Sequence, residues 1–226
     1  MAEKLIHIFK GFMELLFPKK CLGCGVKNVI FCDKCLNSLP FPEDEFGDAK
    51  SAFGRQILAA TSYKNEVIKK AIRLLKYHGI KILAEPLAEL IYRRLCEIRL
   101  RSEIERSRIS FILIPIPLSR KRLRQRGYNQ SELLAEFLSD KMSIKMSADV
   151  LYKIRETISQ VEIKDREKRL KNLQGVFEVK NPELVRNKSV ILVDDITTTG
   201  ATLNEAKRVL TQAGAKKVIG LVVAKG

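Results

Sequence analysis

The stretch Ser189–Thr202, SVILVDDITTTGAT, constrains the fold of this chain more than any other part of the sequence. Its apolar and mostly β-branched run Val190–Val193 is typical of a strand that is buried on both faces of a parallel sheet. Asp194 and Asp195 follow directly, which places two carboxylates where the predicted strand leaves the sheet. A loop with four threonines and one glycine comes next, and a helical pattern of apolar residues then begins. This order predicts a strand, an acidic pair, a short loop and a helix.

The loop after the acidic pair has the composition of a phosphate site. Small residues allow backbone N–H groups to converge on one point, and the start of the following helix favours an anion there. The two carboxylates can accept hydrogen bonds from sugar hydroxyls or hold a hydrated Mg²⁺. We therefore predict a phosphorylated sugar bound together with a metal ion. A buried strand followed by an ordinary threonine cap explains either short motif alone, whereas the whole run in this order is more specific.

The positive charge of the chain is concentrated in its larger part. The 226 residues suit one sizeable α/β domain with a small appendage, and the formal net charge is +16. Residues 1–50 contain seven basic and seven acidic side chains, so residues 51–226 carry the whole excess. Such a field favours polyphosphates and nucleic acids, and charge alone does not choose between them.

Residues 1–18 predict an amphipathic helix. Its apolar side chains recur at helical spacing, and docking on the protein itself is favoured over binding at a membrane surface. Lys10 and Glu14 interrupt the apolar run and no small-residue cleavage site follows, so we expect neither a signal peptide nor a transmembrane segment. A cytoplasmic location is the resulting expectation.

Two Cys-x2-Cys pairs, separated by seven residues, lie within residues 19–40. The sulfurs of each pair can point at one ion, and two pairs together form a tetrahedral Cys₄ zinc site. Disulfides and a redox pair are the alternatives; the lack of an export signal argues against the first and the duplication against the second. Four thiolates leave no open position for a reactive water, so we predict a structural Zn²⁺ held by Cys21, Cys24, Cys32 and Cys35.

A linker and an α/β domain complete the predicted organisation. Residues 41–55 contain proline, glycine and an acidic cluster and are assigned to a linker. In residues 56–226 short apolar strands alternate with helical patterns, which predicts a mostly parallel sheet with helices on both faces. The strands are expected at residues 57–63, 111–114, 176–179, 190–193 and 218–223.

The segment Arg120–Arg126 carries five cations in seven residues and continues into Gly127–Gln130. A solvated basic loop is the usual explanation of such a run. Here the run follows the C-terminal end of a predicted strand, the side where open α/β sheets bind ligands. We therefore expect a mobile lid over an anionic substrate. A second basic group, on the helix predicted after Pro86, is the candidate for a sequence-independent DNA track: Arg93, Arg94, Arg99 and Arg101.

The doubled Cys-x2-Cys, the block IPIPLSRKRLRQRGYNQSELLA and the run VILVDDITTTGATL together resemble the ComF/GntX family. This family contains phosphoribosyltransferase-like proteins associated with DNA uptake in competent bacteria. The resemblance runs from Cys21 to the C-terminus. It implies the fold of type I phosphoribosyltransferases, joined to the small N-terminal zinc-binding module. The block Leu151–Phe177 adds residues of the same pattern: Arg155, Gln160, Arg166, Arg169 and Asn172.

The run around the acidic pair resembles the 5-phosphoribosyl-1-pyrophosphate (PRPP) motif of these enzymes, and this resemblance implies roles for individual residues. Asp194 and Asp195 would face the ribose hydroxyls. Arg124 and Arg126 would cover the pyrophosphate, and these two acids and two arginines are the expected catalytic residues. Thr198 stands where purine-salvage relatives carry an aspartate, which weakens the case for a purine acceptor. Further contacts to PRPP are expected from Lys76, Tyr77, Gly127, Asn129, Gln130, Thr197, Thr198, Thr199, Gly200, Ala201 and Thr202.

Ribosyl transfer from PRPP, with Mg²⁺, to an unidentified acceptor is the reaction that the resemblance implies. Two alternatives stay open. The chain can be a non-catalytic PRPP sensor, or a nucleic-acid module in which the basic surface binds single-stranded DNA and Tyr128 stacks on a base. Competence or recombination proteins are further expected partners.

Overall fold

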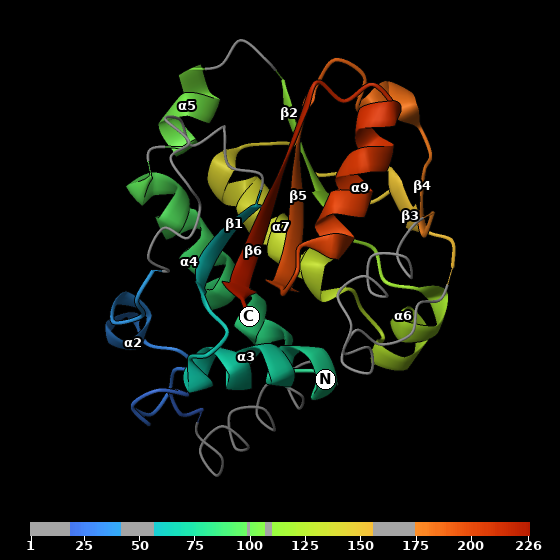
Figure 1. Cartoon of the computed structure of the whole chain (residues 1–226). Helices are drawn as coiled ribbons and strands as arrows, with labels where there is room; N and C mark the ends of the chain where they lie inside the picture. The colour runs from blue at the N-terminus through green and yellow to red at the C-terminus, as the bar shows by residue number, and fades with distance from the viewer. Residues whose placement is uncertain (1–18, 42–56, 99, 107–109, 156–174) are drawn as a thin grey trace, which may run out of the picture. The chain divides into compact units, whose positions relative to one another are not determined.

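The computed structural model describes residues 19–41, 57–98, 100–106, 110–155 and 175–226 (Figure 1). The chain divides into two compact units, Met1–Leu39 and Pro40–Gly226. The predicted N-terminal helix, nearly all of the predicted linker, Arg99 and part of the family block lie outside the described residues. The part of the block concerned is Gln160, Arg166, Arg169 and Asn172.

The first unit is built from a tight turn and a short helix. Lys20 and Lys27 form an antiparallel bridge, and Gly25 between them takes the left-handed conformation at φ +77°. Helix α2 (Asp33–Asn37) follows, with Cys32 as its N-cap residue. The first cysteine pair therefore lies on the turn and the second at the start of α2. A small apolar core supports both: Phe31, Leu36 and Leu39.

The second unit contains a four-stranded parallel sheet in the order β1-β6-β5-β2. Nearly all side chains of the two central strands are buried, as expected for strands covered on both faces. The predicted mostly parallel sheet is therefore confirmed. Its strands are β1 (Ile57–Ser62), β2 (Phe111–Pro115), β5 (Ser189–Thr197) and β6 (Lys217–Lys225).

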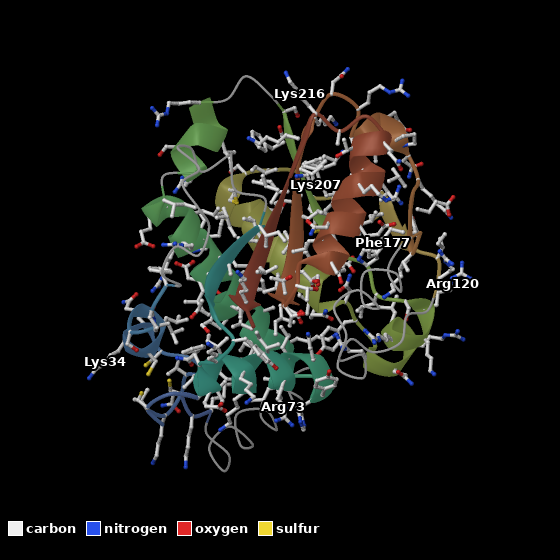
Figure 2. All side chains as sticks on the ribbon, in the orientation of Figure 1. Lys34, Arg73, Arg120, Phe177, Lys207 and Lys216 are labelled. Carbon is white, nitrogen blue, oxygen red and sulfur yellow. The ribbon has the colours of Figure 1, made fainter. Side chains whose placement is uncertain are left out.

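One predicted strand lies outside this sheet. β4 (Phe177–Val179) pairs antiparallel with β3 (Leu151–Lys153) in a separate two-stranded sheet. Glu178 is exposed between partly and fully buried neighbours, an alternation that suits a strand covered on one face. Phe177, labelled in Figure 2, belongs to the hydrophobic core cluster and anchors this small sheet.

Helices cover both faces of the main sheet, as predicted. α4 (Ala84–Glu97) packs on β1 and β6, α7 (Gln130–Met142) packs on β5 and β2, and the two helices pack against each other. α9 (Ala201–Gln212) packs on β5 and β6 from the other face (Figure 1). Within the described residues, no helix has the length and apolar character needed to cross a bilayer. The remaining short elements are α5 (Leu100–Arg106) and the 3₁₀ turns η2 (Lys81–Leu83) and η3 (Pro182–Leu184).

The carboxyl ends of the parallel strands lie at one edge of the sheet, and α3 (Glu66–Tyr77) lies across this edge (Figure 1). The segment that we expected to form a lid is helical and forms α6 (Arg120–Arg126). Ser119 Oγ accepts a hydrogen bond from the N–H of Arg122 and starts this helix, and Gly127 ends it at φ +78°. The carboxyl edge is where parallel sheets of this kind bind ligands.

Candidate functional site

The acidic pair lies within β5, close to its carboxyl end. The sequence predicted that the strand ends at Val193, but β5 continues to Thr197. Both carboxylates are buried, with 9% of Asp194 and 1% of Asp195 exposed. Asp194 Oδ1 accepts a hydrogen bond from Ser131 Oγ at 2.8 Å and another from the backbone N–H of Asp195 at 2.9 Å. The pair is thus held inside the protein and not on an exposed strand end.

Lys76, in the last turn of α3, supplies a cation to this pair. Its Nζ lies 2.9 Å from Asp195 Oδ2, and its side chain is 17% exposed. Burial disfavours the charged lysine, but the charges of Asp195 and Asp194 outweigh this and raise the pKa of Lys76. Burial and the neighbouring Asp195 raise the pKa of Asp194 to about 7, against the opposing effect of Lys76. One lysine does not fully compensate two buried carboxylates, so the site suits hydroxyl donors or a hydrated Mg²⁺.

The loop between β5 and α9 has the backbone of an anion site. Gly200 is the N-cap residue of α9 at φ +76° and has no side chain that could cap the helix. Because the first N–H groups of a helix lack intrahelical partners, they can donate to a phosphate. The positive φ at position 200 favours glycine, because residues with a side chain rarely adopt it. A Cβ there would lie 2.9 Å from Ile57 Cδ1, the end of a flexible side chain. Of the other predicted contacts to PRPP, Thr198 and Thr199 lie in this loop, Thr197 is the last residue of β5, and Ala201 and Thr202 begin α9.

Arg126 connects the basic helix α6 to the end of α3. Its Nη1 donates to Gln130 Oε1, and its guanidinium carbon lies 5.6 Å from the centre of the exposed Tyr77 ring. Arg124 is exposed, and its Nε donates to the carbonyl of Arg120 at 3.4 Å. Of the two arginines predicted to be catalytic, Arg126 is thus held beside the α3 end that carries Lys76.

The segment Gly127–Gln130, which was expected to contact PRPP, is buried apart from its glycine. Asn129 Nδ2 donates to the carbonyl of Ile116 at 3.0 Å, and its Oδ1 accepts from the N–H of Ser131 at 3.1 Å. Gln130 Oε1 accepts from Arg126. These amide groups are therefore occupied by contacts within the protein.

Tyr128 is not exposed in the way that stacking on a base requires. Its ring is buried, its hydroxyl donates to the carbonyl of Leu75, and Lys81 Nζ lies 4.7 Å from the ring centre. The sequence did not predict that the Tyr128 hydroxyl bonds to the end of α3, or that Ser131 bonds to Asp194. Both residues belong to the block that resembles the family, which was the available signal.

The described arginines of α4 and α5, which were expected to form a DNA track, make contacts within the protein. Arg94 is buried, and its Nη1 lies 2.8 Å from Glu97 Oε2. Arg93 pairs with Glu89 at 3.0 Å, and Arg101 lies over a tyrosine ring. These contacts partly neutralise or cover the three arginines, and a DNA track on these helices stays a prediction.

The four cysteines of the first unit come together as predicted. All four sulfurs lie within 4.8 Å of one another, and Cys32 Sγ is 3.6 Å from those of Cys21 and Cys24. Sulfur ligands of a tetrahedral zinc at about 2.3 Å are about 3.8 Å apart, so the cluster fits Zn²⁺ and its sulfurs are too far apart for disulfides. Burial raises the pKa of the Cys21 thiol, but backbone N–H donors at Cys24 and Cys32 outweigh it and lower the pKa to about 6.

A parallel sheet, a buried acidic pair near its carboxyl edge and a glycine-led loop before a helix define a phosphoribosyltransferase-type domain. Residues 129–226 match the family model of the phosphoribosyl transferase domain. The match includes β5, the acidic pair, the loop and α9.

The curated relatives add a biological context. The chain is 28% identical over 220 residues to competence protein F of Haemophilus influenzae, across 95% of this chain and 93% of the relative. It is 37% identical over 106 residues to competence protein ComFC of Bacillus subtilis, across 46% of this chain and 40% of that protein. It is 33% identical over 106 residues to the DNA utilization protein YhgH of Escherichia coli O157:H7, across 47% of this chain and 45% of that protein. The chain is a homologue of these proteins and carries a phosphoribosyl transferase domain, which confirms its resemblance to the ComF family.

Proposed function

We propose that the chain binds PRPP with Mg²⁺ and transfers its ribosyl group to an acceptor, releasing pyrophosphate. The observation that carries this proposal is the buried pair Asp194 and Asp195 at the carboxyl edge, compensated by Lys76 and followed by the start of α9. Two carboxylates suit two ribose hydroxyls, and a helix start suits the 5-phosphate. The competence and DNA-utilization names of the relatives are consistent with a role linked to DNA uptake.

The residues of the site divide the work of this reaction. Asp194 and Asp195 accept hydrogen bonds from the ribose hydroxyls and stabilise the positive charge that grows on the ring as the bond from C1 to pyrophosphate breaks. Lys76 and Arg126 attract the departing pyrophosphate. Mg²⁺ bound with the pyrophosphate supplies further neutralisation of the leaving group. The new bond to C1 comes from the acceptor, so the protein contributes positioning and electrostatics, and no protein nucleophile is needed.

Pyrophosphate release measured together with PRPP binding tests this proposal. We expect Mg·PRPP to bind and pyrophosphate to be released when a suitable acceptor is present, with both signals abolished in Asp194→Asn/Asp195→Asn. Binding without release across nucleobases and amines favours the sensor alternative. Absence of PRPP binding by the folded wild-type chain contradicts both.

A second candidate function, binding of single-stranded DNA, is favoured by α6. Arg120, labelled in Figure 2, and Lys121 are exposed, and no cation of α6 forms an ion pair with a carboxylate in the described part of the chain. Binding of such cations to DNA phosphates makes affinity strongly dependent on salt.

Filter binding across a salt series tests this second function. Arg120→Gln/Lys121→Gln should weaken DNA binding and lower the salt slope by roughly 0.7 for each phosphate that the protein no longer neutralises. Arg93→Gln is the control, because Arg93 is paired with Glu89 and should not contribute. An unchanged slope in the α6 variant, or an equal weakening in the control, contradicts a DNA role for α6.

A further inference from the structure

The segment Gly127–Ser131, which runs from the end of α6 into the first turn of α7, contacts Asp194 and also the helix end that carries Lys76. On one side Ser131 Oγ donates to Asp194 Oδ1 at 2.8 Å. On the other side the Tyr128 hydroxyl donates to the carbonyl of Leu75. Leu75 immediately precedes the lysine that pairs with Asp195, so one short segment supports both carboxylates.

The Tyr128 contact holds the C-terminal end of α3. The last carbonyls of a helix lack intrahelical donors, and the Tyr128 hydroxyl supplies one to Leu75. Burial raises the pKa of this phenol, so it stays protonated and remains a donor. Lys81, the first residue of η2, places its ammonium 4.7 Å from the centre of the Tyr128 ring. The segment from Leu75 to Lys81, which includes Lys76, therefore contacts Tyr128 at both of its ends.

Ser131 is fully buried and takes part in a continuous network. Its N–H donates to Asn129 Oδ1 at 3.1 Å, and Asn129 Nδ2 donates to the carbonyl of Ile116 at 3.0 Å, just beyond β2. Ser131 is thus held by Asn129, which is itself held by the backbone just beyond β2. Its oxygen is directed at the carboxylate and has little access to solvent.

We propose that Ser131 and Tyr128 are positioning residues for the acidic pair: Ser131 fixes the Asp194 carboxylate, and Tyr128 fixes the end of α3 that presents Lys76 to Asp195. Ser131 and Tyr128 affect the substrate through Asp194, Lys76 and Asp195, and neither of them contacts the substrate. This inference rests on the proposed PRPP site. It also reassigns the segment from ligand binding, which the sequence suggested, to support of the site.

Ser131→Ala tests the first contact. Removal of a hydrogen bond to a charged group should weaken Mg·PRPP binding about tenfold in calorimetry. The matched control is Ser139→Ala on the same helix, whose hydroxyl donates to the carbonyl of Ile144 at 2.7 Å and lies away from the pair. We expect the control to bind PRPP like the wild type.

A double-mutant cycle separates positioning from general damage to the fold. If Ser131 acts through Asp194, then Ser131→Ala should cost little further affinity in an Asp194→Asn background. Additive effects overturn the positioning role of Ser131, because a merely structural effect would be the same in both backgrounds.

Tyr128→Phe tests the second contact by removing one hydroxyl and keeping the ring. We expect a several-fold decrease in PRPP affinity that disappears in a Lys76→Met background. Tyr152→Phe is the control, because that ring also lies beside a lysine, Lys180 at 4.6 Å, but on β3. If Ser131→Ala fails to fold, as judged by thermal denaturation, Tyr128→Phe carries the test alone.

Failure of this inference is distinguishable from failure of the proposed function. Unchanged PRPP binding in Asp194→Asn/Asp195→Asn overturns the PRPP site itself. Weakened binding in that variant, combined with wild-type affinity in Ser131→Ala and Tyr128→Phe, overturns the positioning role and leaves the PRPP site intact.

Discussion

Two buried acidic sites in the second unit differ in how their charge is compensated. Glu205 on α9 forms two hydrogen bonds with Arg208, at 2.7 and 2.8 Å, and accepts a third from the N–H of Gly175 at 2.7 Å. The Arg208 bonds lower the pKa of Glu205 although burial opposes them. At the acidic pair the balance is reversed, and burial together with Asp195 raises the pKa of Asp194 to about 7.

We infer from this difference that Glu205 stabilises the fold, whereas Asp194 and Asp195 are available to a ligand. A carboxylate whose acceptor positions are filled inside the protein contributes to stability and retains little affinity for anything else. A pair compensated by a single lysine costs stability but keeps affinity for hydroxyls and cations. This contrast supports the proposal that a ligand binds at the end of β5 and not at the middle of α9.

The cysteine cluster extends the comparison to a site where we propose that a zinc ion supplies the counter-charge. Removal of zinc by a chelator should unfold the first unit, because on the order of 10 kcal/mol of metal-binding free energy is removed, the largest effect we predict. Hydrogen exchange of residues 19–39 and metal analysis measure it.

Cys96→Ser is the control for this experiment. Cys96 is exposed on α4 and outside the cluster, so this variant should still hold one zinc per chain. Purified protein without zinc, with the four thiols oxidised in pairs, contradicts the assignment.

Glu205→Gln sharpens the contrast between the two acidic sites. It removes the charge that Arg208 and Gly175 stabilise and should lower the free energy of unfolding by about 1–3 kcal/mol, towards the lower end because Arg208 is half-exposed. Urea denaturation measures this decrease. PRPP affinity should stay within about twofold of the wild type. A large decrease in PRPP affinity at unchanged stability would break the contrast.

Opposite pH dependences of stability provide a smaller but diagnostic effect. The raised pKa of Asp194 stabilises the fold at low pH, and this contribution is lost as pH rises from 3.8 towards 7. The lowered pKa of Glu205 stabilises the fold above its ordinary pKa of 4.5, and this contribution is lost as pH falls below it.

Denaturation at pH 5 and pH 8 tests these signs. Asp194→Asn should gain stability relative to the wild type between pH 5 and 8, by about 1 kcal/mol or more. If the free energy of unfolding changes with pH in the same way for Asp194→Asn and the wild type, then Lys76 fully compensates the acidic pair.

Local patterns in the sequence were sufficient for the main architecture. The run Val190–Val193 predicted a central strand because a strand buried on both faces must be uniformly apolar. Asn65 predicted the start of α3, and its side chain accepts from the N–H groups of Val67 and Ile68. The spacing of the cysteines predicted their cluster because two short turns suffice to bring the sulfurs together.

Contacts between distant residues were beyond these patterns. Ser131 and Asp194 are 63 positions apart, and nothing in the sequence around either one indicates the other. Arg94 has the same local appearance as an exposed arginine, but packing of its helix buries it. β5 also continues past Val193, where it still pairs with β6, and the sequence around the two carboxylates did not indicate this pairing.

Calorimetry of Mg·PRPP with Asp194→Asn/Asp195→Asn and with Glu205→Gln, side by side, tests the central claim most directly. Each charged hydrogen bond that is removed is worth about 1.5–3 kcal/mol, so the first variant should bind PRPP about 100-fold more weakly or worse, while the second binds like the wild type. Equal affinities in all three proteins, each verified as folded, would contradict the assignment of the acidic pair as the ribose site.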